Sequence, residues 1–127
     1  MDFGTALRRF REERKLSLRE LSALSGVDHA YIHRLETGDK TAPSEDVIDR
    51  LARGLKLTPY KRRLLNVLLT GTEMDSVLFD IAVDTNEDVE VIRAAATMSF
   101  RGARPTTREE WLAKLAQIKE LIGDARG

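Results

Sequence analysis

Apolar residues recur every three or four positions along most of the chain, which is the spacing of one face of an α-helix. Within residues 1–71 this pattern is divided by turn and capping residues. Ser17 with Glu20 three positions later forms a capping box, and Asp28, Ser44 and Thr58 stand where further helices begin. The pattern predicts five short helices, over residues 3–15, 17–26, 29–38, 43–57 and 58–71.

Residues 72–127 have a less regular pattern. The segment 74–83 is too short for its period to separate helix from strand, and we favour a helix. Residues 89–100 form another helical pattern, followed by the basic loop 101–107. Thr107 and Glu110 then form a second capping box before a long helix with a broad apolar stripe. We therefore expect an all-α chain without a sheet, with a five-helix domain at 1–71 and a small helical domain at 72–127.

Composition narrows the classes of protein that fit. The chain has no cysteine, which excludes disulfides and thiolate ligands. No stretch reaches the roughly 18 apolar residues of a membrane-spanning helix, and the first residues lack the apolar run of a signal peptide. We expect a cytoplasmic protein that does not enter membranes. Residues 1–71 contain 14 Lys and Arg against 10 Asp and Glu, and residues 72–127 contain 7 against 11. This asymmetry suits a nucleic-acid module joined to an acidic one, although ordinary scatter of surface charge explains it equally well.

The segments 17–26 and 29–38 have the layout of a helix-turn-helix, because two short helices are joined by a tight turn that contains Gly26. In this motif the second helix enters the major groove of DNA. Ile32 and Leu35 recur at helical spacing and should hold that helix against the domain. The candidates for contact with base edges lie on or beside the opposite face, and they are His29, Ala30, His33 and Arg34.

The segment LRRFREERKLSLRELSALSGVDHAYIHRLETGDKTAPS resembles the Xre family, the Cro and phage-repressor type of helix-turn-helix proteins, and the resemblance continues to about Gly71. It implies a five-helix Cro/repressor-like domain in which Arg11 pairs with Glu36; two unrelated exposed charges are the alternative. It also implies base reading by His29, Ala30 and Arg34, flanked by Asp28 and His33. Arg34 is the best candidate for guanine, because its planar fork can meet O6 and N7 together.

Phosphate contacts are less distinct in the sequence. Members of the family often have glutamine where this chain has Leu18, at the start of the second helix. Ser17 and the free N–H groups at that helix start could still hold a phosphate. Arg19 and Lys40 are further candidates, with a plain solvated side chain as the alternative at each position.

A metal site is the competing interpretation of His29 and His33, which lie one helical turn apart as in the zinc-binding HExxH motif. Ala30 replaces the catalytic glutamate of that motif, and the chain has no third histidine and no cysteine. We therefore expect no metal. Because no phosphate loop, nucleophile elbow or catalytic triad pattern is present either, we expect a protein without a cofactor that is not an enzyme.

The apolar stripe of the last predicted helix needs a surface on which to pack. We expect it to form a dimer interface, and the alternative is that it completes the core of the monomer. Its residues are Trp111, Leu115, Ile118 and Ile122.

The segment MSFRGARPTTREEWLAKLAQIKELI resembles the C-terminal part of the radiation-response repressors of Deinococcus and their relatives. The shared arrangement is a helix, a basic RG-R-P loop and a helix with an early tryptophan. The resemblance implies that this part dimerises and that an ImmA/IrrE-type metallopeptidase inactivates the protein by cutting between Phe100 and Arg101. An ordinary solvated loop is the alternative.

Together these patterns predict a sequence-specific DNA-binding transcriptional regulator, most simply a repressor that binds a palindromic double-stranded operator as a homodimer. Two alternatives remain at this point. One is an antitoxin that uses the same DNA-binding module and whose acidic half binds a toxin. The other is a protein-interaction module that keeps the fold and has lost DNA binding.

Overall fold

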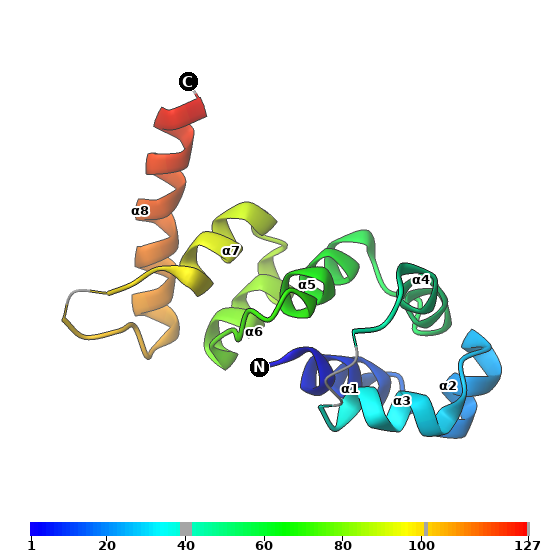
Figure 1. Cartoon of the computed structure of the whole chain (residues 1–127). Helices are drawn as coiled ribbons and strands as arrows, with labels where there is room; N and C mark the ends of the chain where they lie inside the picture. The colour runs from blue at the N-terminus through cyan, green and yellow to red at the C-terminus, as the bar shows by residue number, and fades with distance from the viewer. Residues whose placement is uncertain (39–41, 101, 127) are drawn as a thin grey trace. The chain divides into compact units, whose positions relative to one another are not determined.

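The computed structural model describes residues 1–38, 42–100 and 102–126, and this part of the chain consists of eight α-helices without a strand (Figure 1). The all-α prediction is confirmed. The segment that was ambiguous between helix and strand is the helix Ser76–Thr85. In chain order the helices are α1 (Phe3–Glu13), α2 (Leu18–Ser25), α3 (His29–Glu36), α4 (Glu45–Gly54), α5 (Pro59–Leu69), α6 (Ser76–Thr85), α7 (Val89–Thr97) and α8 (Arg108–Arg126).

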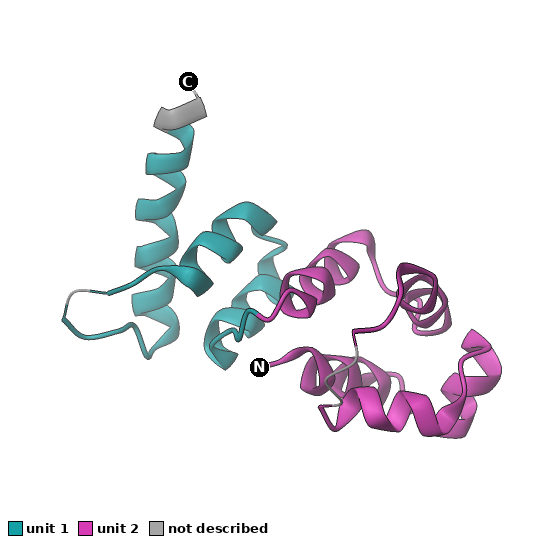
Figure 2. Cartoon of the chain, viewed as in Figure 1, with its two compact units in different colours: residues 1, 72–127 teal, residues 2–71 magenta. Residues whose placement is uncertain are grey.

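The helices belong to two compact units (Figure 2). One comprises Asp2–Gly71 and holds α1 to α5; the other comprises Met1 and Thr72–Gly127 and holds α6 to α8. In the five-helix unit α1 packs on α3 and α5, and α2 packs on α3 and α4. The side chains that fill the core of this unit are Ala6, Leu7, Phe10, Leu21, Val27, Ile32, Leu35, Ile48, Leu51, Ala52, Leu55, Leu64, Leu65, Val67 and Leu68.

Local capping determines where the helices of the five-helix unit begin. Ser17 Oγ accepts the N–H of Glu20 at 3.0 Å, and the N–H of Ser17 donates to Glu20 Oε1 at 2.9 Å, so the predicted capping box is confirmed. These hydrogen bonds from Ser17 hold the pKa of Glu20 below its ordinary value. The other four helices of this unit begin in the same way, each with a side-chain oxygen that accepts a backbone N–H of the first turn. Their caps are Asp2, Asp28, Ser44 and Thr58.

An ion pair joins α1 to the C-terminal end of α3. Arg11 donates from Nε to Glu36 Oε2 at 2.7 Å and from a terminal nitrogen to Glu36 Oε1 at 2.8 Å. Its other terminal nitrogen donates to the carbonyl of Leu16 at 2.8 Å. The side chain of Arg11 is 12% exposed and that of Glu36 is 3% exposed, so the ion pair is largely shielded from solvent. The carboxylate of Glu36 raises the pKa of Arg11 further above its ordinary value.

Gly4 allows α1 to approach the end of α3 closely. A Cβ atom at this position would lie 2.5 Å from the carbonyl oxygen of Leu35 and 2.6 Å from that of Glu36. Both are backbone atoms, which cannot move aside as the tip of a side chain can. Gly4 and Arg11 therefore act on the same end of α3, the first through close packing and the second through charge.

The three-helix unit has its own core, in which α8 packs on both α6 and α7. Trp111 is completely buried, and its ring meets the ring of Phe100 edge to face, with centroids 5.9 Å apart. Asp75 caps α6, Asp88 caps α7 and the hydroxyl of Thr107 accepts the N–H of Glu110 at 3.1 Å at the start of α8. The loop before α8 is thus folded against the helix that follows it.

The apolar stripe of α8, which is expected to form a dimer interface, is largely buried within the chain itself. Trp111, Leu115 and Ile118 are at most 3% exposed within the chain itself, and Ile122 is half-buried. These side chains pack in the core of their own unit, and a dimer interface that uses them stays a prediction. The exposed leucines of α8, Leu112 and Leu121, stand nine residues apart, which places them on opposite sides of the helix at about 100° per residue. The alternative, a stripe that completes the monomer core, agrees with this packing.

Gly4→Ala should destabilise the five-helix unit. The added Cβ must push α1 away from α3, and such overpacking costs about 1–3 kcal/mol. Chemical denaturation followed by circular dichroism measures the loss. Gly123→Ala is the matched control, because nothing lies within 4 Å of a Cβ built there, and the better helix propensity of alanine should leave stability equal or higher. If the Gly4→Ala protein is as stable as the parent, α1 and α3 are not packed too closely for a methyl group.

Arg11→Met should destabilise the unit by about 3 kcal/mol, because it leaves the buried carboxylate of Glu36 without its partner. The double variant Arg11→Met, Glu36→Leu should recover most of that loss, since no buried charge remains. Arg8→Met provides the control: its pair with Glu12 is more than half exposed and should contribute at most about 0.5 kcal/mol. Equal losses for Arg8→Met and Arg11→Met would refute a special role for the buried pair.

Candidate nucleic-acid interface

Three consecutive residues, Ser25, Gly26 and Val27, shape the turn between α2 and α3 in different ways. Gly26 ends α2 with φ of 74°, a left-handed conformation that glycine adopts without strain. Ser25 is buried, and its Oγ accepts the N–H of Val27 at 3.1 Å. Val27 is itself 6% exposed and anchors the turn in the core. The chain therefore reverses between the two helices without leaving a buried backbone N–H unpaired at Val27.

The helix α3 has one buried side and one outer side. Ile32 and Leu35 are 0% and 3% exposed and hold the helix in the core. The candidates for base contact occupy the outer side: Ala30, His33 and Arg34 are exposed, and the side chain of His29 is 43% exposed. The structure thus brings the four predicted residues to one accessible helix surface, supported from behind by apolar packing.

Asp28 and Tyr31 frame this surface. Asp28 Oδ2 accepts the N–H of Tyr31 at 3.2 Å, and its Oδ1 lies 3.9 Å from Nδ1 of His29. One carboxylate therefore caps α3 and stands next to the first reading candidate. The guanidinium of Arg34 lies over the ring of Tyr31, 5.6 Å from its centroid. This cation–π contact, worth about 0.5–1 kcal/mol at an exposed site, limits the positions available to the guanidinium.

The start of α2 is the candidate site for DNA phosphate. Ser17 and Arg19 are exposed there, while Leu18 is half-buried. The hydroxyl of Ser17 already satisfies the N–H of Glu20, and the preceding N–H groups of a helix start have no partner within the helix. Such groups and the positive end of the helix dipole favour an anion. Lys40, the other predicted phosphate contact, lies outside the described residues.

The metal hypothesis gains no support from the neighbours of the histidines. Across residues 1–38, 42–100 and 102–126, no three His, Cys, Asp or Glu side chains gather in a way that could hold a metal ion. The carboxylate that lies beside His29 is that of Asp28, which also serves as the cap of α3.

The predicted peptidase site lies in a segment without helix, between α7 and α8. Phe100 is half-buried, and the guanidinium of Arg104 lies 5.5 Å from its ring centroid and 5.7 Å from that of Trp111. The ammonium of Lys114 also approaches the ring of Phe100, at 5.7 Å. Phe100 is therefore held against α8 by stacking, and Arg101, on the other side of the expected cut, lies outside the described residues.

Sequence reasoning missed Gly4, which contacts no DNA candidate and yet determines how closely α1 approaches the end of α3. A glycine within a helical pattern was the available signal, because glycine weakens a helix interior and is retained there for a packing reason. None of the helices in the described part of the chain is long and apolar enough to cross a membrane.

Comparison with known proteins agrees with this geometry. A helix-turn-helix domain model matches residues 2–65. The transcriptional repressor RghR of Bacillus subtilis is 46% identical over 59 residues, a stretch that spans only 46% of this chain and 43% of RghR. The uncharacterised regulator Rv0474 of Mycobacterium tuberculosis is 30% identical over 84% of this chain and 77% of its own length. The regulator DdrOP3 of Deinococcus deserti is 25% identical over 91% of this chain and 95% of its own length.

The domain model covers half of the chain, and the similarity to Rv0474 continues well beyond it. The match includes the capped α2, the turn at Gly26 and the exposed side of α3, which are the parts that a helix-turn-helix needs to reach DNA. The chain therefore belongs to the helix-turn-helix transcriptional regulators, proteins that bind DNA and control transcription.

Proposed function

We propose that this regulator is a repressor that binds a palindromic operator as a homodimer and reads each half-site with α3. The observation that supports this most is the arrangement of α3, whose outer side presents His29, Ala30, His33 and Arg34 while its inner side and its C-terminal end are fixed. A helix held in this way can enter a major groove without losing its position.

The dimer follows from the size of the contact. One recognition helix covers only a short half-site, and proteins of this type gain affinity when two copies bind half-sites about one helical turn apart. A dimer across a promoter represses by blocking access to it, with no further part required. The similarity to RghR, which is named a transcriptional repressor, supports repression.

In this proposal the side chains of α3 contact the bases, and those of α2 contact the phosphate backbone. Arg34 reads guanine through its planar fork, Ala30 contacts the methyl group of thymine and His29 donates to a base or a phosphate. Ser17 and Arg19 at the start of α2 bind the phosphate backbone, which fixes the register of the protein on the duplex but carries no sequence information. Lys40 adds a phosphate contact after α3.

Inactivation by proteolysis is a second proposal, for which the segment between α7 and α8 provides the support. This segment has no helix around Phe100, and Gly102 adopts φ of 89°, so the backbone there is already outside regular structure. An ImmA/IrrE-type metallopeptidase would bind it in extended form and cut between Phe100 and Arg101. Cleavage would separate α8 from the segment whose Phe100 ring packs on Trp111.

Arg34→Ala should weaken binding to a selected operator by about 5- to 100-fold, the equivalent of the roughly 1–3 kcal/mol of one bidentate base contact. Replacing the guanine that Arg34 contacts should weaken the parent protein and leave the variant unchanged. Fluorescence anisotropy on a set of operators with single base changes measures both effects.

Arg8→Ala is the control for this measurement, because Arg8 is an exposed arginine on α1 that pairs with Glu12. It should leave operator preference unchanged. If Arg34→Ala weakens binding to every sequence by the same factor, Arg34 contacts phosphate and the base-reading role is wrong.

Incubation with an ImmA/IrrE-type metallopeptidase should yield two fragments whose masses correspond to residues 1–100 and 101–127. Arg104→Ala should be cut faster, because Arg104 lies over both rings and its removal loosens the Phe100 stack. Intact-mass spectrometry measures the products, with chelator-treated peptidase as the control. A chain that stays intact, or is cut elsewhere, would exclude this mode of inactivation.

A further inference from the structure

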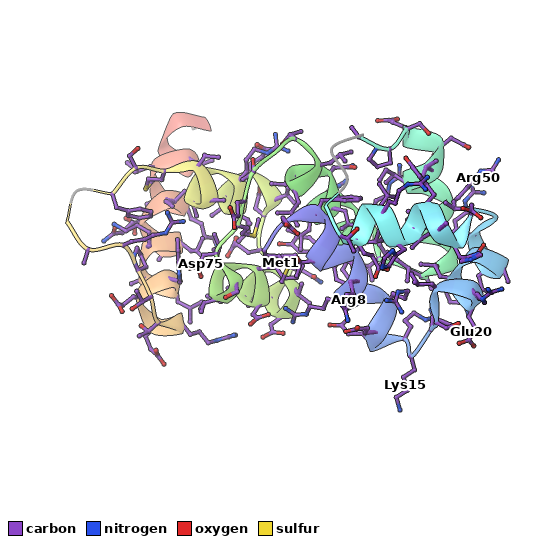
Figure 3. The ribbon with its side chains drawn as sticks, turned by 60° about the horizontal axis from the view of Figure 1, so that its bottom comes forward. Met1, Arg8, Lys15, Glu20, Arg50 and Asp75 are labelled. Atoms are coloured by element: carbon purple, nitrogen blue, oxygen red, sulfur yellow. The ribbon has the colours of Figure 1, made fainter. Side chains whose placement is uncertain are left out.

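The turns that follow α1 and α4 are built in the same way, each around a lysine. Lys15 has φ of 56° and Lys56 has φ of 52°, in the left-handed region that is common for glycine and uncommon for lysine. In both turns the N–H of the following leucine donates to a carbonyl of the preceding helix, at 3.2 Å after α1 and at 2.9 Å after α4. Both lysines are exposed, and Figure 3 shows Lys15 projecting from the ribbon. Each turn therefore presents an ammonium group to solvent from a backbone that hydrogen bonds hold in place.

These two turns lie next to each other in the five-helix unit. Arg14 donates from a terminal nitrogen to the carbonyl of Leu55 at 3.2 Å, and this hydrogen bond joins the end of α1 to the end of α4. Lys15 directly follows Arg14, and Lys56 directly follows Leu55. The two exposed lysines therefore belong to one region of the surface, although they are 41 residues apart in the sequence.

The packing of α4 on α2 brings this region to the start of α2. A Cβ atom at Gly26, after the end of α2, would lie 3.3 Å from a terminal nitrogen of Arg50. A Cβ atom at Gly54, near the end of α4, would lie 3.1 Å from a methyl carbon of Leu21. The two helices therefore run in opposite directions, and the turn after α4 lies toward the start of α2. That start is the candidate site for DNA phosphate described above.

The surface of these turns carries a surplus of positive charge, and we call it the basic end. Its four cations are exposed, and none of them has an ion pair with a described carboxylate: Arg14, Lys15, Arg53 and Lys56. Glu12, Glu13 and Asp49 lie in the neighbouring segments, and each pairs with another cation. Glu20, at the start of α2, adds one negative charge. Four cations against this single charge leave the basic end net positive.

Phosphate groups of DNA are the ligands that fit the basic end best. Its cations are exposed and stand beside Ser17 and Arg19, so a duplex that contacts the start of α2 would bring further phosphates close to them. A protein partner would need apolar surface for the buried centre of its interface. The large apolar side chains exposed in the described part of the chain are Leu24, Leu112 and Leu121, and none of them belongs to these turns.

We propose that the basic end binds phosphates of the DNA backbone beside those held by the start of α2. One copy then contacts the duplex with two turns from outside the helix-turn-helix, in addition to α2 and α3. This inference rests on the proposed function for the presence of DNA on this side of the protein. Each phosphate contact releases a condensed counterion, so the basic end adds affinity that depends on salt and is independent of base sequence.

Replacement of both lysines by glycine tests the proposal without disturbing the fold. Lys15→Gly, Lys56→Gly removes two charges at positions where glycine adopts the backbone conformation without strain, so the variant should be at least as stable as the parent. A plot of log association constant against log salt concentration should lose about 0.9 of its slope for each phosphate contact removed. The affinity should fall by the same factor for a selected operator and for an unrelated duplex. Fluorescence anisotropy over a series of salt concentrations measures both effects.

Two controls separate charge from other consequences of the substitutions. Lys15→Arg, Lys56→Arg keeps both charges and should keep the slope of the parent. Arg8→Gln removes an exposed cation that pairs with Glu12, outside the basic end, and it should leave the slope unchanged. Chemical denaturation followed by circular dichroism verifies that every variant is folded.

A folded Lys15→Gly, Lys56→Gly variant that keeps the parent slope overturns the proposal, and an acidic protein would then be the ligand to test for the basic end. A loss confined to the operator also overturns it, because every DNA sequence has the same phosphates.

The proposed function is decided by a different measurement, the base preference that Arg34→Ala should remove. If that preference is found and the glycine variant keeps the parent slope, the proposed function stands and the basic end does not bind DNA. If the glycine variant has a lower slope and the parent prefers no sequence, the basic end stands and the specific operator does not.

Discussion

The ion pair between Arg11 and Glu36, which is largely shielded from solvent, connects the helices of the DNA-binding unit. Arg11 holds both oxygens of Glu36 and also the carbonyl of Leu16, so one guanidinium links α1, the end of α3 and the segment that leads into α2. Such a pair contributes less to stability than its short distances suggest, because both ions lose water. Removing either partner would leave a buried charge without its counterpart, which is strongly destabilising.

Both units have an apolar core and capped helix starts, and the three-helix unit adds aromatic stacking around α8. The five-helix unit combines an apolar core with five capped helix starts, which fixes where each helix begins. The three-helix unit relies on α8, whose Trp111 is buried and whose preceding loop is held by the stacked Phe100 and Arg104. The buried indole Nε1 of Trp111 has no hydrogen-bond partner within the described structure. Because a buried N–H without a partner loses its hydrogen bond to water, the burial of Trp111 costs part of the free energy that its packing contributes.

The helices were predictable because their signals are local. Ser17 with Glu20, the caps at Asp28 and Thr58, and Gly26 act within a few residues, and the structure has them where the pattern places them. The outer side of α3 followed from the same periodicity.

Features that depend on distant parts of the chain were not predictable in this way. An apolar stripe shows that α8 must be covered, but its sequence does not state whether α6 and α7 or a second copy covers it. The close approach at Gly4 likewise arises only when segments far apart in sequence meet, because the atoms near its Cβ position belong to Leu35 and Glu36.

The contact at Gly4 also bears on how genetic results for this protein are to be interpreted. The space between α1 and the end of α3 has no room for a methyl group, although Gly4 is not among the candidates for contact with DNA. A screen for loss of regulation would therefore recover substitutions in α1 alongside those in α3, and a map drawn from phenotype alone would assign α1 to the DNA surface. Two sets of substitutions separate these roles. Sensitivity to side-chain size at position 4 identifies a residue that positions the recognition helix, whereas sensitivity to charge at position 34 identifies a residue that contacts DNA.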